Sequence, residues 1–182
     1  MSAERDARWL LQRLREEEDL RPPYRLQREQ RWVMEATVLR DERGDPMAYT
    51  ELRKHLGAVE LTTVVVDPHH RGKGLSHALV EAAVQSTAAR PLILFTRSAA
   101  LERAVARAGF VQRRIWNPLT LSSVGLRAAM RCGRMLLLGD LRKLWAQVAH
   151  VAAFRCWVLD MERRGESFLF RPCHRQTAQI GF

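Results

Sequence analysis

The sequence predicts a mixed α/β fold with a helical C-terminal elaboration. A β-branched run, Val64–Val66, leads into a basic glycine-rich loop and then into a segment with helical spacing. The residues before this run alternate as strands do and are separated by turn residues, whereas the residues after Pro118 place apolar side chains at helical spacing. With 182 residues, 47% of them hydrophobic, the chain can bury a core without disulfides or a metal.

Ahead of the loop, the pattern predicts one helix and three strands. Residues Ala3 to Leu20 are amphipathic, and Pro22 and Pro23 end this helix because proline cannot continue it. From Trp32 the period becomes that of strands, with a turn at Asp41 to Asp45. The expected strands form an antiparallel meander and span Val33 to Arg40, Met47 to His55 and Val59 to Asp67.

After the loop, helices and strands alternate before a mostly helical last third. The short apolar run Leu92 to Thr96 is typical of a buried strand, and Gly139-Asp140 is the expected break between two later helices. We expect a single domain with an N-terminal helical segment (1–31), a core that holds the loop (32–117), and a helical elaboration with a final strand (118–182). The other expected helices span Leu75 to Thr87 and Ala99 to Ala108, and the other expected strands span Phe110 to Trp116 and Ser167 to Arg171.

The loop itself predicts a ligand that carries phosphate. Gly72 and Gly74 leave room for backbone N–H groups to approach an anion, and Arg71 and Lys73 add positive charge. The N-terminus of the helix that follows presents further unpaired N–H groups. The loop matches neither the P-loop nor the dinucleotide-binding fingerprint, which require other glycine spacings.

The run Val-Val-Val-Asp-Pro-His-His-Arg-Gly-Lys-Gly-Leu, from Val64 to Leu75, resembles the GNAT superfamily of acyl-CoA-dependent N-acyltransferases. The signature of that family is Gln or Arg, two residues, Gly, one residue, then Gly or Ala. Here it spans His69 to Gly74 and departs at its first position, which is His. A helix that ends in Ala108-Gly109-Phe110 is also similar to the family, so the resemblance covers about Trp32 to Trp116.

The resemblance implies a GNAT fold, in which a twisted central sheet changes from antiparallel to parallel pairing around the CoA site. It implies acetyl-CoA as co-substrate, with the pyrophosphate on the loop and the pantetheine arm along the preceding strand. The implied activity is N-acetyl transfer to a primary amine of a small molecule, a protein or a nucleic-acid-linked acceptor. The residues expected to bind acyl-CoA are Val64, Val65, Val66, His69, His70, Arg71, Gly72, Lys73, Gly74, Leu75 and Ser76.

For the general base, the resemblance points to Glu60, near the start of the strand before the loop. Many family members have a carboxylate there that takes the proton of the attacking amine, directly or through water. The alternative is an exposed strand residue, or an ion-pair partner of Arg53 or Lys54.

No residue is assigned as the general acid. The family has a Tyr four residues before the Gly of the Gly-Phe pair, and Val105 occupies that position here. Ser98, Cys132 or water are left as proton donors to the departing thiolate, and Tyr49 is expected to pack in the core. The missing Tyr keeps open a second function, that of a catalytically inactive GNAT-fold module that binds nucleic acid or another partner.

The formal charge of +10 favours anionic partners, and it keeps nucleic acid open as an acceptor or ligand. For the basic helices after Pro118 we favour packing against the core or a homodimer interface over a platform for substrate or nucleic acid.

Three cysteines at wide spacing do not suggest a disulfide framework, and no apolar stretch is long enough to suggest a membrane span. We therefore expect a cytoplasmic protein with no membrane association. The standard zinc-ligand spacings are absent, so no metal site is expected, and His69 and His70 are expected to cap the turn or touch phosphate.

Overall fold

The computed structural model describes residues 2–17, 20–87, 91–113, 117–149 and 155–159. Within these residues the strands build one six-stranded sheet in the order β1-β2-β3-β4-β6-β5. The strands are β1 (Thr37–Arg40), β2 (Pro46–His55), β3 (Ala58–Val66), β4 (Leu92–Thr96), β5 (Val111–Gln112) and β6 (Arg155–Leu159). The α-helices are α1 (Ser2–Glu16), α2 (Leu26–Glu35), α3 (Leu75–Ser86), α4 (Ala99–Arg107), α5 (Pro118–Leu137) and α6 (Leu141–Val148), and a short 3₁₀ turn, η1, covers Pro68–His70.

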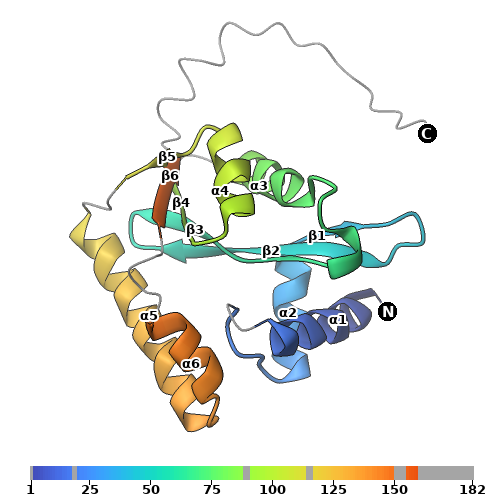
Figure 1. Ribbon diagram of the computed structural model, residues 1–182, viewed down its shortest axis with the longest axis horizontal. Helices are drawn as coiled ribbons and strands as arrows, with labels where there is room; N and C mark the ends of the chain where they lie inside the picture. The colour runs from blue at the N-terminus through green and yellow to red at the C-terminus, as the bar shows by residue number, and fades with distance from the viewer. Residues whose placement is uncertain (1, 18–19, 88–90, 114–116, 150–154, 160–182) are drawn as a thin grey trace, which may run out of the picture.

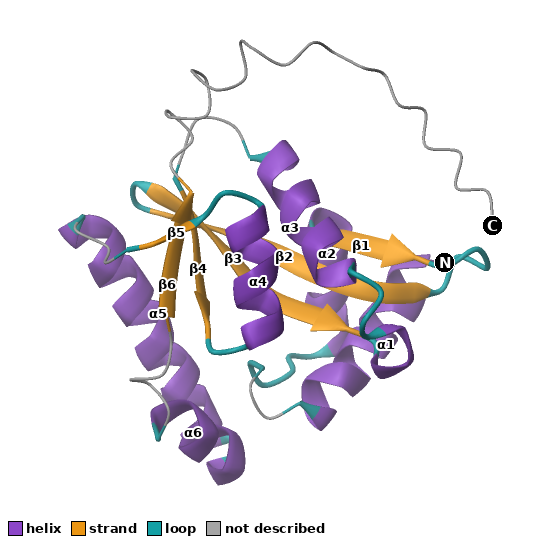
Figure 2. Cartoon of the chain, turned by 45° about the horizontal axis from the view of Figure 1, so that its top comes forward, coloured by secondary structure: helices purple, strands orange, loops and turns teal. Residues whose placement is uncertain are grey.

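The sheet mixes both pairing directions, as the resemblance implied. Strands β1, β2 and β3 form an antiparallel meander, β3 pairs with β4 in parallel, and β4, β6 and β5 are antiparallel again. Helices α3 and α4 cover one face, while α1, α2, α5 and α6 lie on the other (Figure 1). The view in Figure 2 shows α3 and α4 side by side in front of the sheet.

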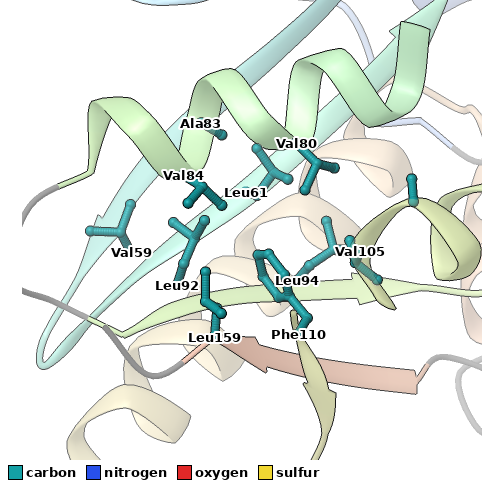
Figure 3. Close-up of a cluster of buried hydrophobic side chains, with 11 residues drawn as sticks. Val59, Leu61, Val80, Ala83, Val84, Leu92, Leu94, Val105, Phe110 and Leu159 are labelled. Atoms are coloured by element: carbon teal, nitrogen blue, oxygen red, sulfur yellow. The ribbon is translucent and has the colours of Figure 1, made fainter. Parts of the chain in front are cut away.

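Each face of the sheet has its own hydrophobic core. The larger core lies under α3 and α4, where Val80 and Val84 of α3 meet strand residues such as Leu61, Leu92 and Leu94 (Figure 3). The smaller core lies under α1 and α2, and its buried members are Ala7, Leu10, Leu14, Val33, Tyr49 and Val65. Burial of these apolar side chains is the main favourable contribution to folding.

Residues Val33 to Glu35 are helical, so the expected strand over Val33 to Arg40 is wrong in its first half. They end α2, a helix that the sequence pattern did not reveal. Leu26, Glu29 and Val33 share one face of α2 by helical spacing, and Glu29 and Val33 are buried. The tertiary contacts of this face outweigh the strand preference of Val33, because β propensity depends strongly on context.

The helical part of the elaboration follows the prediction, with α5 and α6 separated at Gly139, whose φ is +69°. Strand β6 lies in a segment for which no strand was expected, and it stands between β4 and β5. Strand β5 covers only Val111–Gln112 of the strand expected from Phe110, and residues 114–116 lie outside the described residues. The expected strand from Ser167 to Arg171 also lies outside them.

The packing of α5 and α6 is partial. Thr120, Met135 and Ala146 are buried, but Leu137 is 90% exposed and Trp145 73% exposed. No helix in the described part of the chain is long and apolar enough to cross a membrane. In the same residues, no group of three or more His, Cys, Asp or Glu side chains is placed to hold a metal ion.

Candidate active site

The glycine-rich loop is shaped by a turn and two left-handed residues. Asp67 begins the turn η1 and accepts a hydrogen bond from the backbone N–H of His69 at 3.0 Å. Gly72 and Gly74 have φ values of +82° and +76°, a conformation that glycine adopts without the steric cost other residues meet. Gly74 then directly precedes α3.

The loop presents backbone donors to an open space. A Cβ atom added to Gly72 or Gly74 would meet nothing within 4 Å. The backbone N–H groups of residues 72 to 76 donate no hydrogen bond to any of the described residues. The first N–H groups of a helix carry partial positive charge, so these amides are suited to an anion.

Asp67 anchors the loop to the N-terminal helix. Its Oδ2 accepts a hydrogen bond from the indole Nε1 of Trp9 at 3.1 Å, and the guanidinium of Arg13 lies 3.9 Å away. Burial raises the pKa of Asp67, but the hydrogen bonds from Trp9 and His69 and the charge of Arg13 outweigh it and hold the pKa below its usual value. At neutral pH the side chain is therefore an anion with fixed donors.

Strand β3 has a bulge in its pairing with β2 and an open edge beside this loop. Glu51 pairs with Thr62 and Tyr49 with Val65, so Thr63 and Val64 both stand opposite Thr50. Thr63 has a φ of +52°, which is strained for a β-branched residue. The parallel pairing of β3 with β4 is limited to Val59–Leu61, so the rest of this edge of β3 is left without a partner strand.

A cleft of about 1220 Å³ runs along this open edge. Its walls come from both faces of the sheet, with α3 and α4 on one side and α2, α5 and α6 on the other. Most of the residues expected to bind acyl-CoA line it: Val64, Val65, Val66, His70, Arg71, Gly72, Gly74, Leu75 and Ser76. His69 and Lys73 are not among the lining residues.

Glu60 lines the same cleft and has a buried partner. Its Oε2 lies 2.7 Å from Nε2 of His55, and Nδ1 of His55 lies 2.9 Å from Oγ of Ser123 on α5. The side chain of His55 has no exposed surface, whereas that of Glu60 is 19% exposed. Arg53, one of the ion-pair partners considered for Glu60, bonds Glu51 instead.

Of the positions considered for a general acid, two are buried in the hydrophobic cores and two line the cleft. Val105 is fully buried in the core under α3 and α4, so its side chain does not reach the cleft. Tyr49 is buried in the other core, where its hydroxyl donates to Glu51 at 2.9 Å, and burial raises its pKa. Ser98 and Cys132 both line the cleft.

A buried ionic cluster that the sequence pattern did not single out supports the wall on the α2 side. Arg21 donates to Glu29 at 2.7 and 2.8 Å and to Glu51 at 2.6 Å. Burial alone would lower the pKa of Arg21, but its two carboxylate partners raise it, so Arg21 stays charged. The one signal in the sequence is that Glu29 falls on the apolar face of α2, and this signal is visible only once that helix is known.

Two aromatic rings complete this wall. Tyr24 and Trp32 meet edge to face, with ring centroids 4.8 Å apart. The Arg53 guanidinium lies 3.8 Å from the centroid of Trp32, and that of Arg28 lies 4.2 Å from the centroid of Tyr24. Such stacking fixes the plane of a guanidinium group.

Three solved structures are similar to this chain to different degrees. The Mycobacterium tuberculosis protein Rv2747, in complex with CoA and NLQ, superposes with a TM-score of 0.57 at 20% identity, over 85% of this chain and 93% of its own. The Escherichia coli GNAT family N-acetyltransferase YhbS, in complex with CoA, gives a TM-score of 0.45 at 19% identity, over 63% of this chain and 72% of its own. A spermidine N-acetyltransferase SpeG chimera from Vibrio cholerae and hSSAT gives 0.44 at 18% identity, over 60% of this chain and 77% of its own. No curated protein matches the chain significantly.

The family model of the acetyltransferase (GNAT) family matches residues 4–110, which is more than half of the chain. This match contains most of α1, then α2, the meander, the glycine-rich loop, α3, β4 and α4. Acetyl-CoA as co-substrate is consistent with this match. On these grounds the chain belongs to the acetyltransferase (GNAT) family.

Proposed function

We propose that this protein transfers the acetyl group of acetyl-CoA to a primary amine, with Glu60 as the general base. The observation that carries the proposal is one cleft that holds both the unpaired amides of the glycine-rich loop and the carboxylate of Glu60. The loop supplies an anion site, and Glu60 supplies a proton acceptor.

Each part of the cleft has a role in this reaction. The loop amides, with Arg71 beside them, bind the pyrophosphate, and the open edge of β3 at Val64 and Val66 receives the pantetheine arm. Rv2747, which shares the fold, was solved with CoA, in line with this assignment.

The reaction needs one base and one acid. Glu60 takes a proton from the amine as its nitrogen bonds to the thioester carbon, and the C–S bond then breaks. The departing thiolate takes its proton from water or from a cleft side chain such as Ser98 or Cys132. Water suffices because a thiolate is a tolerable leaving group.

A second candidate function is an inactive GNAT-fold module that binds nucleic acid or another partner. The observation that favours it is Val105, a core residue where the family has a Tyr. Release of free CoA thiol with an amine supports the enzyme. Salt-dependent nucleic-acid binding without thiol release supports the module.

The first test is thermal stabilisation by acetyl-CoA. A ligand that binds only the folded state at a hundred times its Kd raises the Tm of a chain this size by about 5 to 10 °C. Gly72→Asp places a carboxylate and a strained residue in the anion site, so the shift should disappear. Gly139→Asp is the matched control, because Gly139 also has a positive φ and open space around it but lies between α5 and α6. No shift in the wild type, or equal shifts in both variants, refutes the cofactor site.

A homodimer through α5 and α6, a cytoplasmic location and a nucleic-acid-linked acceptor remain predictions from the sequence. The exposed apolar side chains of α5 and α6 are compatible with the first of these. Sedimentation measurements at several concentrations will decide the oligomeric state.

A further inference from the structure

The end of the cleft around Glu60 is rich in arginine. Its walls there are built by α2, β2, α5 and the segment that precedes α2. Glu60 is one of two acidic residues that line the cleft, and the other, Glu17, forms an ion pair with Arg71 of the loop. The arginines of these walls are Arg21, Arg28, Arg53, Arg127 and Arg131.

Two of these arginines are neutralised by the protein. Arg21 pairs with Glu29 and Glu51, and Arg53 pairs with Glu51. This cluster therefore holds two positive and two negative charges. It needs no ligand to balance it.

Arg28, Arg127 and Arg131 are different, because none of them pairs with a carboxylate among the described residues. Arg28 stacks on the rings of Tyr24 and Trp32, at 4.2 and 4.9 Å from their centroids. Nη2 of Arg127 donates to the backbone carbonyl of Lys54 at 2.9 Å. Nε of Arg131 is buried without a hydrogen-bond partner.

Unneutralised guanidinium groups in one partly enclosed cleft repel each other and favour a bound anion. A guanidinium presents several N–H donors in a plane that matches a carboxylate or phosphate group. Stacking on Tyr24 and Trp32 holds the plane of Arg28 fixed, which lowers the entropy lost when an anion binds.

We infer that the acceptor is a small primary amine that itself carries an oxyanion, either a carboxylate or a phosphate. Arg28, Arg127 and Arg131 bind the oxyanion, and Glu60 takes the proton of the amine in the same cleft. This inference rests on the proposed function and names the class of amine that acts as the acceptor. A polycationic amine is disfavoured, because its remaining charges would lie among these arginines.

The test compares pairs of amine acceptors in which one member carries an oxyanion and the other does not. The pairs are glycine with glycinamide, aspartate with its diamide, and O-phosphoethanolamine with ethanolamine, with spermidine as a polycation. Acetylation is followed by release of CoA thiol. We expect kcat/KM to be about 10- to 100-fold higher for the oxyanionic member of at least one pair, the range of a charged hydrogen bond. The pairs separate carboxylate from phosphate.

Variants then connect the preference to the arginines. Arg28→Gln and Arg127→Gln should raise KM for the oxyanionic acceptor about tenfold, with little change for its neutral partner. Arg31→Gln is the matched control, because Arg31 is an exposed arginine on the same helix as Arg28 and does not line the cleft. Stabilisation by acetyl-CoA should be the same in the wild type and in these three variants.

The possible results distinguish a failure of this inference from a failure of the proposed function. If acetyl-CoA stabilises the protein but neutral amines or spermidine are the better acceptors, the inference is wrong and the proposed function stands. The same holds if no oxyanionic amine is acetylated, or if the arginine variants lower activity equally with every acceptor. If acetyl-CoA gives no stabilisation, the proposed function fails and takes the inference with it.

Discussion

The Glu60 carboxylate lies 2.7 Å from Nε2 of His55, a side chain with no exposed surface. A carboxylate accepts hydrogen bonds, so the tautomer of His55 with its proton on Nε2 donates to Glu60, and its Nδ1 then accepts from the hydroxyl of Ser123. This chain of hydrogen bonds connects β3, β2 and α5. Glu60 therefore keeps one oxygen fixed by the protein, while its Oε1 makes no hydrogen bond to the described residues.

Glu60→Gln should lower kcat by about 100- to 10,000-fold, the usual contribution of a general base. The variant keeps the size of the side chain, so the Tm shift with acetyl-CoA should not change. Steady-state kinetics with the best acceptor and the Tm measurement together check this. Glu42→Gln, at the exposed turn between β1 and β2, is the control and should behave as the wild type. Activity retained in Glu60→Gln excludes this base.

Ser123→Ala removes the far end of the hydrogen-bond chain and leaves His55 free to change its tautomer. A His55 that no longer donates to Glu60 leaves the carboxylate free to turn away from the position in which it reaches the amine. We expect a loss of kcat of a few fold with KM for acetyl-CoA unchanged. Ser122→Ala, one residue earlier and exposed, is the control. A lower Tm of the variant without ligand would instead indicate a structural role.

Asp67→Asn should destabilise the fold at neutral pH by about 1 to 2 kcal/mol, the contribution of hydrogen bonds to a charged group. The folded-state pKa of Asp67 is lowered, so this stabilisation is present above the unfolded-state pKa and is lost as the pH falls through the folded-state value. Urea unfolding of both proteins should therefore show a difference at pH 7 that shrinks toward pH 2. A difference that is constant with pH contradicts the charged role of Asp67.

Glu29→Gln should lower the free energy of unfolding by about 3 kcal/mol or more, because it leaves part of the charge of a buried arginine without a partner. Glu29 is fully buried, and one of its oxygens also accepts from the backbone N–H of Tyr24 at 2.8 Å. Chemical denaturation measures the loss. Glu35→Gln, exposed on the same helix, should change stability by less than about 0.5 kcal/mol.

Cys156 should react slowly with alkylating reagents, because burial and the negative charge of Glu60 raise the pKa of its thiol to about 11. Only the thiolate reacts. In a Cys132→Ser, Cys173→Ser background at pH 9, the additional change Glu60→Gln should increase the alkylation rate a few fold. The same background with Glu42→Gln should show no increase. An unchanged rate in the Glu60 variant would mean that the charge of Glu60 does not reach Cys156.

Local patterns predicted much of the fold. The turn at Gly44, the meander after it and the helix at Leu75 follow from residue spacing and from where glycine and proline stand. Strand β6 was missed because its partners, β4 and β5, are far away in the sequence, and pairing of this kind leaves no local signal. Helix α2 was missed because its buried face contains a charged residue, Glu29, whose partner Arg21 lies outside the helix. Hydrophobic periodicity does not reveal such a pair.

The sequence by itself determined the family, the glycine-rich loop and the candidate base, because each depends on residue types at short fixed spacing. Only the tertiary structure decided what lies around Glu60. The pairing of β3 with β4 ends at Leu61, so the edge of β3 beyond it stays open. His55 and Ser123 fix the carboxylate, and arginines from α2 and α5 line one cleft. The physical reason is that charge balance in a cleft depends on which side chains converge in space, and convergence across about a hundred residues is a property of packing.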